Sequence, residues 1–105
     1  SGTNVISNDN VPSSIGLGDI YPNPFNPKTT IEYSMLKDAH LKLYVYNIKG
    51  ELVDELVNSS MLKGDYKITW DASHLHSGIY FISFNIYNND KILDFVMTEK
   101  LMLIK

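Results

Sequence analysis

The sequence contains no cysteine in its 105 residues. This absence excludes disulfide bonds, thiolate nucleophiles and zinc sites built on cysteine. It does not decide the redox compartment, because a domain without cysteine is compatible with the cytosol and with the cell exterior. Long apolar runs are lacking as well, so no segment is expected to span a membrane.

An excess of positive charge is also lacking. The chain carries 9 basic and 12 acidic residues, interspersed along its length, with a formal net charge of −3. Without a basic stripe it cannot neutralise a phosphate backbone, which argues against nucleic acid as a partner. A length of 105 residues and a hydrophobic content of 44% suit one globular domain with a modest core.

The first residues lack the basic and apolar segments of an export signal, and there is no initiator methionine. We therefore expect the chain to be an excised piece of a larger protein. Residues 1–14 are rich in Ser, Asn, Asp, Gly and Thr, a composition that buries too little apolar surface to offset chain entropy. This composition predicts a flexible linker over residues 1–14, followed by a single domain over residues 15–105.

Alternation of apolar and polar residues, which is typical of strands with one buried face, runs through most of the remaining chain. The pattern predicts strands at Ile15–Ile20, Thr30–Met35, His40–Asn47, Glu51–Val57, Tyr66–Trp70 and Ile79–Tyr87, and one long strand or two between Lys91 and Lys105. Glu51–Val57 also fits a helical face, but so short a segment is unstable as a helix. Leu36–Ala39 has a length that suits a hairpin. About seven short strands predict an all-β sandwich of two antiparallel sheets.

Two features stand out within this pattern. Tyr21–Pro27 contains three of the four prolines, which fix φ and push the preceding residues out of the helical region. Asn23 and Asn26 can close side-chain turns on the backbone, so the segment is expected to form a stiff corner between strands. Trp70, the only tryptophan, alternates with polar residues and is expected to anchor the core.

The densest cluster of reactive side chains is Asp71–Ser77, which has the residue types of a hydrolytic triad and a histidine pair, His74 and His76. Triads assemble from distant segments, because adjacent loop residues seldom reach the necessary geometry. Only His40 is left as a third imidazole, and its distance in sequence argues against a metal site. No phosphate loop, nucleophile elbow or dinucleotide fingerprint is present. We therefore expect no enzymatic activity, no metal and no cofactor.

Several segments carry a resemblance to a known family. They are Tyr21–Pro27 with Thr29–Ile31, Leu43–Val53, Trp70–Asp71 with Ser77–Phe81, and the lysine-bounded segment Lys100–Lys105. In this order and spacing they resemble the type A sorting domains of the type IX secretion system, which are bacterial carboxy-terminal domains. Sandwich modules of the flagellar hook-capping protein are similar to this pattern as well.

The resemblance implies an immunoglobulin-like β-sandwich at the end of a larger cargo protein from a bacterium of the Bacteroidota or a related phylum. Cargo with such a domain enters the periplasm in transit, is recognised by the outer-membrane translocon, and reaches the cell surface or the exterior. A sortase-like cysteine peptidase typically removes the domain, often with attachment of the cargo to surface lipopolysaccharide. The resemblance therefore implies cleavage within residues 1–14.

The residues that match the motifs of this family are Pro22, Asn23, Pro24, Gly78, Ile79, Tyr80, Lys100 and Lys105. One departure concerns Asn88–Thr98, which is longer than is usual before the last strand and predicts an extended or bulged final hairpin.

The last strand, Glu99–Lys105, is our candidate for the recognised surface together with nearby turns. Its apolar residues lie between lysines, so it can pair at a sheet edge while the charges suppress self-association. Pairing of two copies through such an edge is a further expectation. The main alternative is a binding or adhesion module that stays on the mature protein, which an exposed row of Tyr44, Tyr46 and Tyr87 would favour.

Overall fold

The computed structural model describes residues 16–105 and contains seven β-strands. The strands are β2 (Gly16–Tyr21), β3 (Lys28–Met35), β4 (Ala39–Asn47), β5 (Leu52–Met61), β6 (Gly64–Asp71), β7 (Gly78–Tyr87) and β8 (Leu93–Leu103). The predicted linker and Ile15 lie outside the described residues. Within residues 16–105 the structure has no helix with the length and hydropathy of a membrane span.

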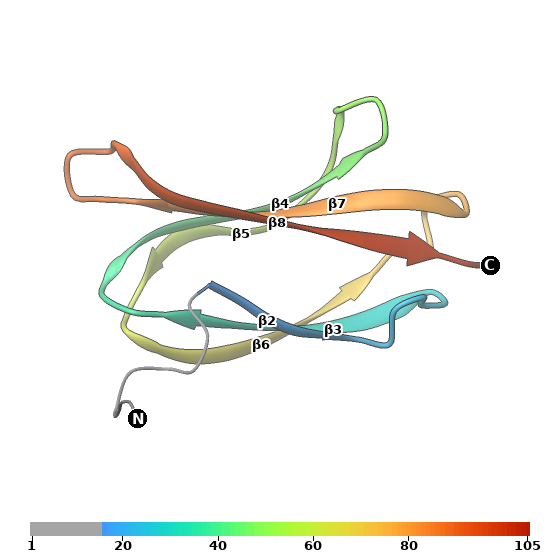
Figure 1. The fold of residues 1–105 in the computed structure, drawn as a ribbon, viewed down its shortest axis with the longest axis horizontal. Coiled ribbons are helices and arrows are strands. Elements are labelled where there is room, and N and C mark those ends of the chain that lie inside the picture. Colours follow the sequence, from blue (N-terminus) through green and yellow to red (C-terminus); the bar gives the residue numbers. More distant parts are fainter. Residues whose placement is uncertain (1–15) are drawn as a thin grey trace, which may run out of the picture.

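The strands form two sheets that pack face to face (Figure 1). One sheet has the order β2-β3-β6, and the other has the order β5-β4-β7-β8, with every neighbouring pair antiparallel. An immunoglobulin domain of the constant type also divides seven antiparallel strands between two sheets. Its fourth strand lies beside its fifth, whereas β5, the fourth strand of this chain, lies beside β4, the third. The prediction of an all-β sandwich of about seven antiparallel strands is confirmed.

The alternation seen in the sequence corresponds to alternation in burial. In β3, Ile31, Tyr33 and Met35 are buried, and the residues between them face outward. β4 repeats the pattern, with Leu41, Leu43 and Val45 fully buried. Successive side chains of a strand point to opposite faces, so one face of each sheet contributes to a shared core.

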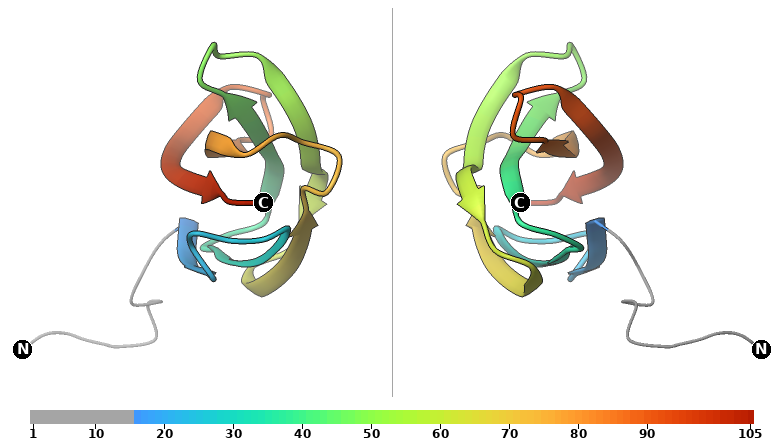
Figure 2. Two further views of the ribbon diagram at one scale, coloured as in Figure 1. Left: turned by 90° about the vertical axis from the view of Figure 1, so that its right-hand side faces the viewer. Right: turned by 90° about the vertical axis from the view of Figure 1, so that its left-hand side faces the viewer.

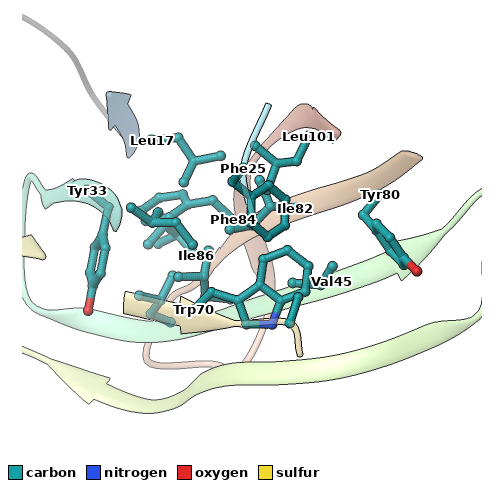
Figure 3. Close-up of a cluster of buried hydrophobic side chains, with 14 of the residues drawn as sticks. Leu17, Phe25, Tyr33, Val45, Trp70, Tyr80, Ile82, Phe84, Ile86 and Leu101 are labelled. Carbon is teal, nitrogen blue, oxygen red and sulfur yellow. The ribbon is translucent and has the colours of Figure 1, made fainter. Parts of the chain in front are cut away.

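The core lies between the sheets, and aromatic rings from both of them meet in it (Figure 3). The bulkiest fully buried side chains are those of Trp70, Phe25 and Phe84, each at most 2% exposed. The burial of Trp70 confirms that it anchors the core. Phe25 belongs to the proline-rich corner, so this corner contributes to the core as well as connecting strands.

The segment Leu36–Ala39 does not close a hairpin, so that prediction is wrong. β3 pairs with β2 and β6, whereas β4 pairs with β5 and β7 in the opposite sheet. The connection therefore crosses from one sheet to the other. Asp38 helps to fix the crossing, because its Oδ1 accepts a hydrogen bond from the backbone N–H of Lys63 at 2.8 Å. A short connection suits a hairpin and a crossing between sheets equally well, so the length of this segment does not distinguish the two topologies.

The fourth predicted strand is longer than expected. β5 continues beyond the predicted end at Val57 through Asn58, Ser59 and Ser60, which pair with Lys42, Leu41 and His40 in that order. β5 is an edge strand with two register shifts, which bend the strand and protect its open edge. Asn58, Ser59 and Ser60 are exposed, so backbone hydrogen bonds rather than burial of their side chains keep them in the sheet.

The last segment of the chain forms one strand rather than two. β8 pairs with β7 over its whole length, and one register shift occurs between Ile86 and Tyr87. This irregularity confirms the bulged final hairpin. The hairpin turn is closed by the N–H of Asn88, which donates to the carbonyl of Ile92 at 3.0 Å.

β2 begins close to the start of β8, although the two strands belong to different sheets. A Cβ atom at Gly16 would lie 3.0 Å from Cε2 of Phe95, and the φ angle of Gly16 is +84°. Both observations require glycine at this position. Since β2 runs from here into the proline-rich corner, its course brings the corner to the other end of β8.

Candidate recognition site

The proline-rich corner lies along the outer edge of the last strand. The N–H of Phe25 donates to the carbonyl of Met102 at 2.9 Å, and the N–H of Ile104 donates to the carbonyl of Phe25 at 2.9 Å. Phe25 thus forms a parallel bridge with Leu103. The corner acts as a one-residue strand that covers part of the sheet edge.

The side chain of Asn23 extends this pairing. Its Oδ1 accepts a hydrogen bond from the N–H of Met102 at 3.1 Å, and its Nδ2 donates to the carbonyl of Lys100 at 3.2 Å. An amide side chain offers one donor and one acceptor group, as a peptide unit does. The outer edge of β8 is therefore occupied from Lys100 to Ile104.

The same corner is fixed to the sandwich on its other side. The buried hydroxyl of Thr29 donates to the carbonyl of Pro22 at 2.8 Å. The N–H of Ala72 donates to the carbonyl of Pro27 at 2.9 Å. Inside the core, the rings of Phe25 and Trp70 lie with their centroids 5.2 Å apart. These contacts confirm a corner between strands. The expectation that Asn23 closes a local turn is wrong, because its amide bonds the backbone of β8 instead.

Lys105 connects the end of the last strand to the loop between β6 and β7. Its Nζ donates to the carbonyls of Ser73 and Leu75 at 2.6 and 2.7 Å. Its backbone N–H donates to Oγ of Ser77 at 3.0 Å. Charged donors make the stronger class of hydrogen bond, so Lys105 holds this loop against the end of β8.

The segment Gly78–Tyr80 opens β7 beside the last strand. Gly78 lies opposite Leu103, and Tyr80 lies opposite Leu101. The Tyr80 ring is buried near Trp70, with centroids 6.0 Å apart, and its hydroxyl donates to the carbonyl of His76 at 2.7 Å. Tyr80 therefore fixes the same loop that Lys105 contacts.

The structure thus brings together at one end of the sandwich the residues that match the family motifs, although they are far apart in sequence. The left view of Figure 2 faces this end, at which the chain terminates. Asn23, Tyr80 and Lys105 make structural contacts there. The side chains of Pro22, Pro24 and Lys100 are exposed, and Ile79 is half-buried. The backbone partners at Phe25 and Met102 were missed by motif reasoning, because a main-chain hydrogen bond leaves no side-chain signal.

The reactive side chains of Asp71–Ser77 have separate structural partners. Oδ1 of Asp71 accepts from the N–H of Ser73 at 3.0 Å, and hydrogen bonding with Ser73 lowers the pKa of this carboxyl. Nε2 of His74 lies 3.3 Å from Oδ2 of Asp54, which also accepts from the indole N–H of Trp70 at 2.8 Å. Among residues 16–105 no group of three His, Asp or Glu side chains is arranged to hold a metal.

A hollow of about 500 Å³ lies elsewhere, between β4, β5 and the β7–β8 turn. Its lining includes His40, which pairs with Oδ1 of Asn58 at 2.7 Å. It also includes Lys42, whose Nζ lies 4.7 Å from the centre of the Tyr87 ring. Tyr44 and Tyr46 are half-buried on the same sheet face, with ring centroids 6.5 Å apart. Tyr44 and Tyr46 therefore do not form the exposed row of rings that would favour a binding or adhesion module.

The amide of Asn23 provides a test of the edge contact. Asn23→Asp removes the donor to the Lys100 carbonyl and places a carboxylate against it, so we expect a loss of about 1–2 kcal/mol in the free energy of unfolding. Amide hydrogen exchange at Met102 should become faster. Asn26→Asp is the matched control, because it adds the same charge in the same exposed corner; equal losses in the two variants would contradict the proposed contact.

A family model described as the secretion system C-terminal sorting domain matches residues 19–98. The chain belongs to this family. The matched region begins in β2, includes the proline-rich corner and extends into β8. The protein is therefore a sorting domain of the type IX secretion system, which directs the secretion of its cargo to the cell surface or the exterior.

A solved structure is similar to this sorting domain in fold. It comes from a study of PorZ, described as an essential bacterial surface component of the type-IX secretion system of human oral-microbiomic Porphyromonas gingivalis. The TM-score is 0.52 with 20% sequence identity, over 86% of this chain and 12% of that chain. The sorting domain thus corresponds to a small part of that protein. No curated protein matches the chain in sequence.

Proposed function

We propose that this sorting domain is recognised on the periplasmic side of the outer membrane by the type IX translocon. A sortase-like cysteine peptidase then cuts within residues 1–14 and releases the cargo from the domain, with attachment of the cargo to the cell surface. Residues 15–105 act as one folded signal in this scheme. The motif residues serve this function in two ways. Asn23, Tyr80 and Lys105 hold one end of the sandwich together. The side chains of Pro22, Pro24 and Lys100 are exposed and available to a partner.

The position of Gly16, the first residue that the structure describes, supports this proposal. Gly16 lies against Phe95 near the start of β8, whereas Phe25 and Lys105 lie at its other end. Leu103 lies eight positions after Phe95 along an extended strand, which corresponds to roughly 26 Å at about 3.3 Å per residue. This separation is compatible with a peptidase that acts at the end where Gly16 lies while the translocon holds the end where Phe25 and Lys105 lie.

The mass of the secreted cargo tests this proposal. In a bacterium that possesses the secretion system, the mature parent protein should lack most of the 11.9 kDa that this chain contributes. Intact-mass spectrometry with identification of the new carboxy terminus should place the cut within residues 1–14. A mature protein that keeps the full mass would contradict removal, and would instead favour a binding or adhesion module retained on the cargo.

A further inference from the structure

The outer face of the four-stranded sheet, which points away from the core, carries an apolar patch beside the recognition site. Leu52, Tyr46, Phe81 and Lys100 lie directly opposite one another across β5, β4, β7 and β8. Ile79 and Met102 form the next row. We call these six residues the outer patch. Leu52 is 52% and Met102 is 39% exposed, so apolar side chains on this face are accessible.

The outer face of the three-stranded sheet differs from the outer patch, because polar side chains pair across it. On its outer face Glu32 lies opposite Lys67, and their charged groups approach to 3.7 Å. Nearby, the hydroxyl of Ser34 donates to Oδ1 of Asp65 at 2.7 Å. An exposed face of an antiparallel sheet is ordinarily polar in this way. Apolar residues in adjacent rows are therefore a deviation that indicates a contact surface.

Lys100 is the only charged residue of the outer patch. Within residues 16–105 its Nζ has no carboxylate within ion-pair distance. Its backbone is held in place, because the carbonyl of Lys100 accepts the hydrogen bond from Asn23. The proline-rich corner thus fixes the backbone of Lys100, which lies directly opposite Phe81 in the sheet and has an exposed side chain.

We propose that the outer patch docks a protein component of the secretion apparatus, whose own contact surface is apolar and carries a carboxylate opposite Lys100. This inference rests on the proposed function. Apolar area supplies the contact, and the ion pair sets the orientation and selects the partner. Two of the motif residues, Ile79 and Lys100, are in the patch, so they are read by the partner, whereas Asn23 and Lys105 hold the structure.

Secretion of a reporter fused to the full 105-residue chain tests the outer patch. In a host with the secretion system, Lys100→Glu and Phe81→Thr should each lower surface display by about tenfold or more, because opposed like charges and lost apolar contact both disfavour docking. Lys100→Arg should keep display near the unaltered level. Lys63→Glu, in the exposed turn before β6, is the matched control for charge reversal and should display normally.

The variants must stay folded for this comparison, so the thermal unfolding midpoint of each purified chain is also measured. A midpoint within about 5 °C of the unaltered chain shows that folding is preserved. Undiminished display of both patch variants, with the unaltered fusion displayed, would overturn the patch and leave the proposed function standing. No display of the unaltered fusion would overturn both. A concentration-dependent dimer that Lys100→Glu dissociates would also overturn the patch as proposed, since it would identify a second copy as the occupant.

Discussion

Removing residues 100–105 is expected to unfold the domain. Leu101 and Leu103 are each only 1% exposed, and replacing one such leucine by alanine typically costs about 2–5 kcal/mol. The deletion also removes the backbone partners of Phe25 and of the Asn23 amide. Together these losses are comparable with the roughly 5–15 kcal/mol that stabilises an ordinary domain. The truncated chain should show no cooperative thermal transition by circular dichroism.

Deletion of Lys105 alone is the control for this truncation. It removes the hydrogen bonds to Ser73, Leu75 and Ser77 but leaves the core intact, so the domain should stay folded with a lower melting temperature. A cooperative transition in the six-residue truncation would contradict the account. Loss of secretion after the six-residue truncation would then result from loss of folding. The residues that a partner contacts can be identified only by single substitutions of exposed side chains.

Replacing Trp70 by alanine should give the largest loss of stability for a single side chain. The indole is 2% exposed and lies between Phe25 and Tyr80, at centroid distances of 5.2 and 6.0 Å. Its N–H also donates to Asp54, which would be left without this donor. Loss of a buried tryptophan typically costs about 3–5 kcal/mol, and denaturant unfolding at a constant m-value measures it.

Two further variants separate the contributions of Trp70. Trp70→Phe keeps an aromatic ring but loses the bond to Asp54 and some volume, so we expect about 1–3 kcal/mol. Ile48→Ala, at a side chain that is 71% exposed, should change stability by less than about 0.5 kcal/mol. If Trp70→Ala were as mild as Ile48→Ala, this result would contradict the packing of the indole between Phe25 and Tyr80.

The parts of the fold that follow from local patterns could be predicted from the sequence. Strict alternation in Thr30–Met35 and His40–Asn47 identified two strands and their buried faces, because a half-buried sheet selects side chains with a period of two. The prolines of Tyr21–Pro27 indicated a corner for an equally local reason. Trp70 was correctly expected in the core.

The parts that depend on distant partners could not be predicted in this way. Nothing near Asn23 indicates that its amide bonds Lys100 and Met102, which lie 77 and 79 residues away. The same limit explains the wrong hairpin at Leu36–Ala39, since sheet assignment depends on which strands pair elsewhere. The same limit applies to Glu99–Lys105. The expectation that this strand offers an open edge for pairing is wrong, because the corner occupies the edge from Lys100 to Ile104. Its outward side chains remain available to a partner.

The most direct test of the central claim, that this chain directs cargo through the type IX secretion system, compares two isogenic hosts. A periplasmic reporter fused to the full chain is expressed in a host with the system and in the same host without a functional translocon. Access of external antibody to intact cells measures surface display. We expect display only in the first host and retention of the reporter in the periplasm of the second. The same distribution in both hosts would contradict it.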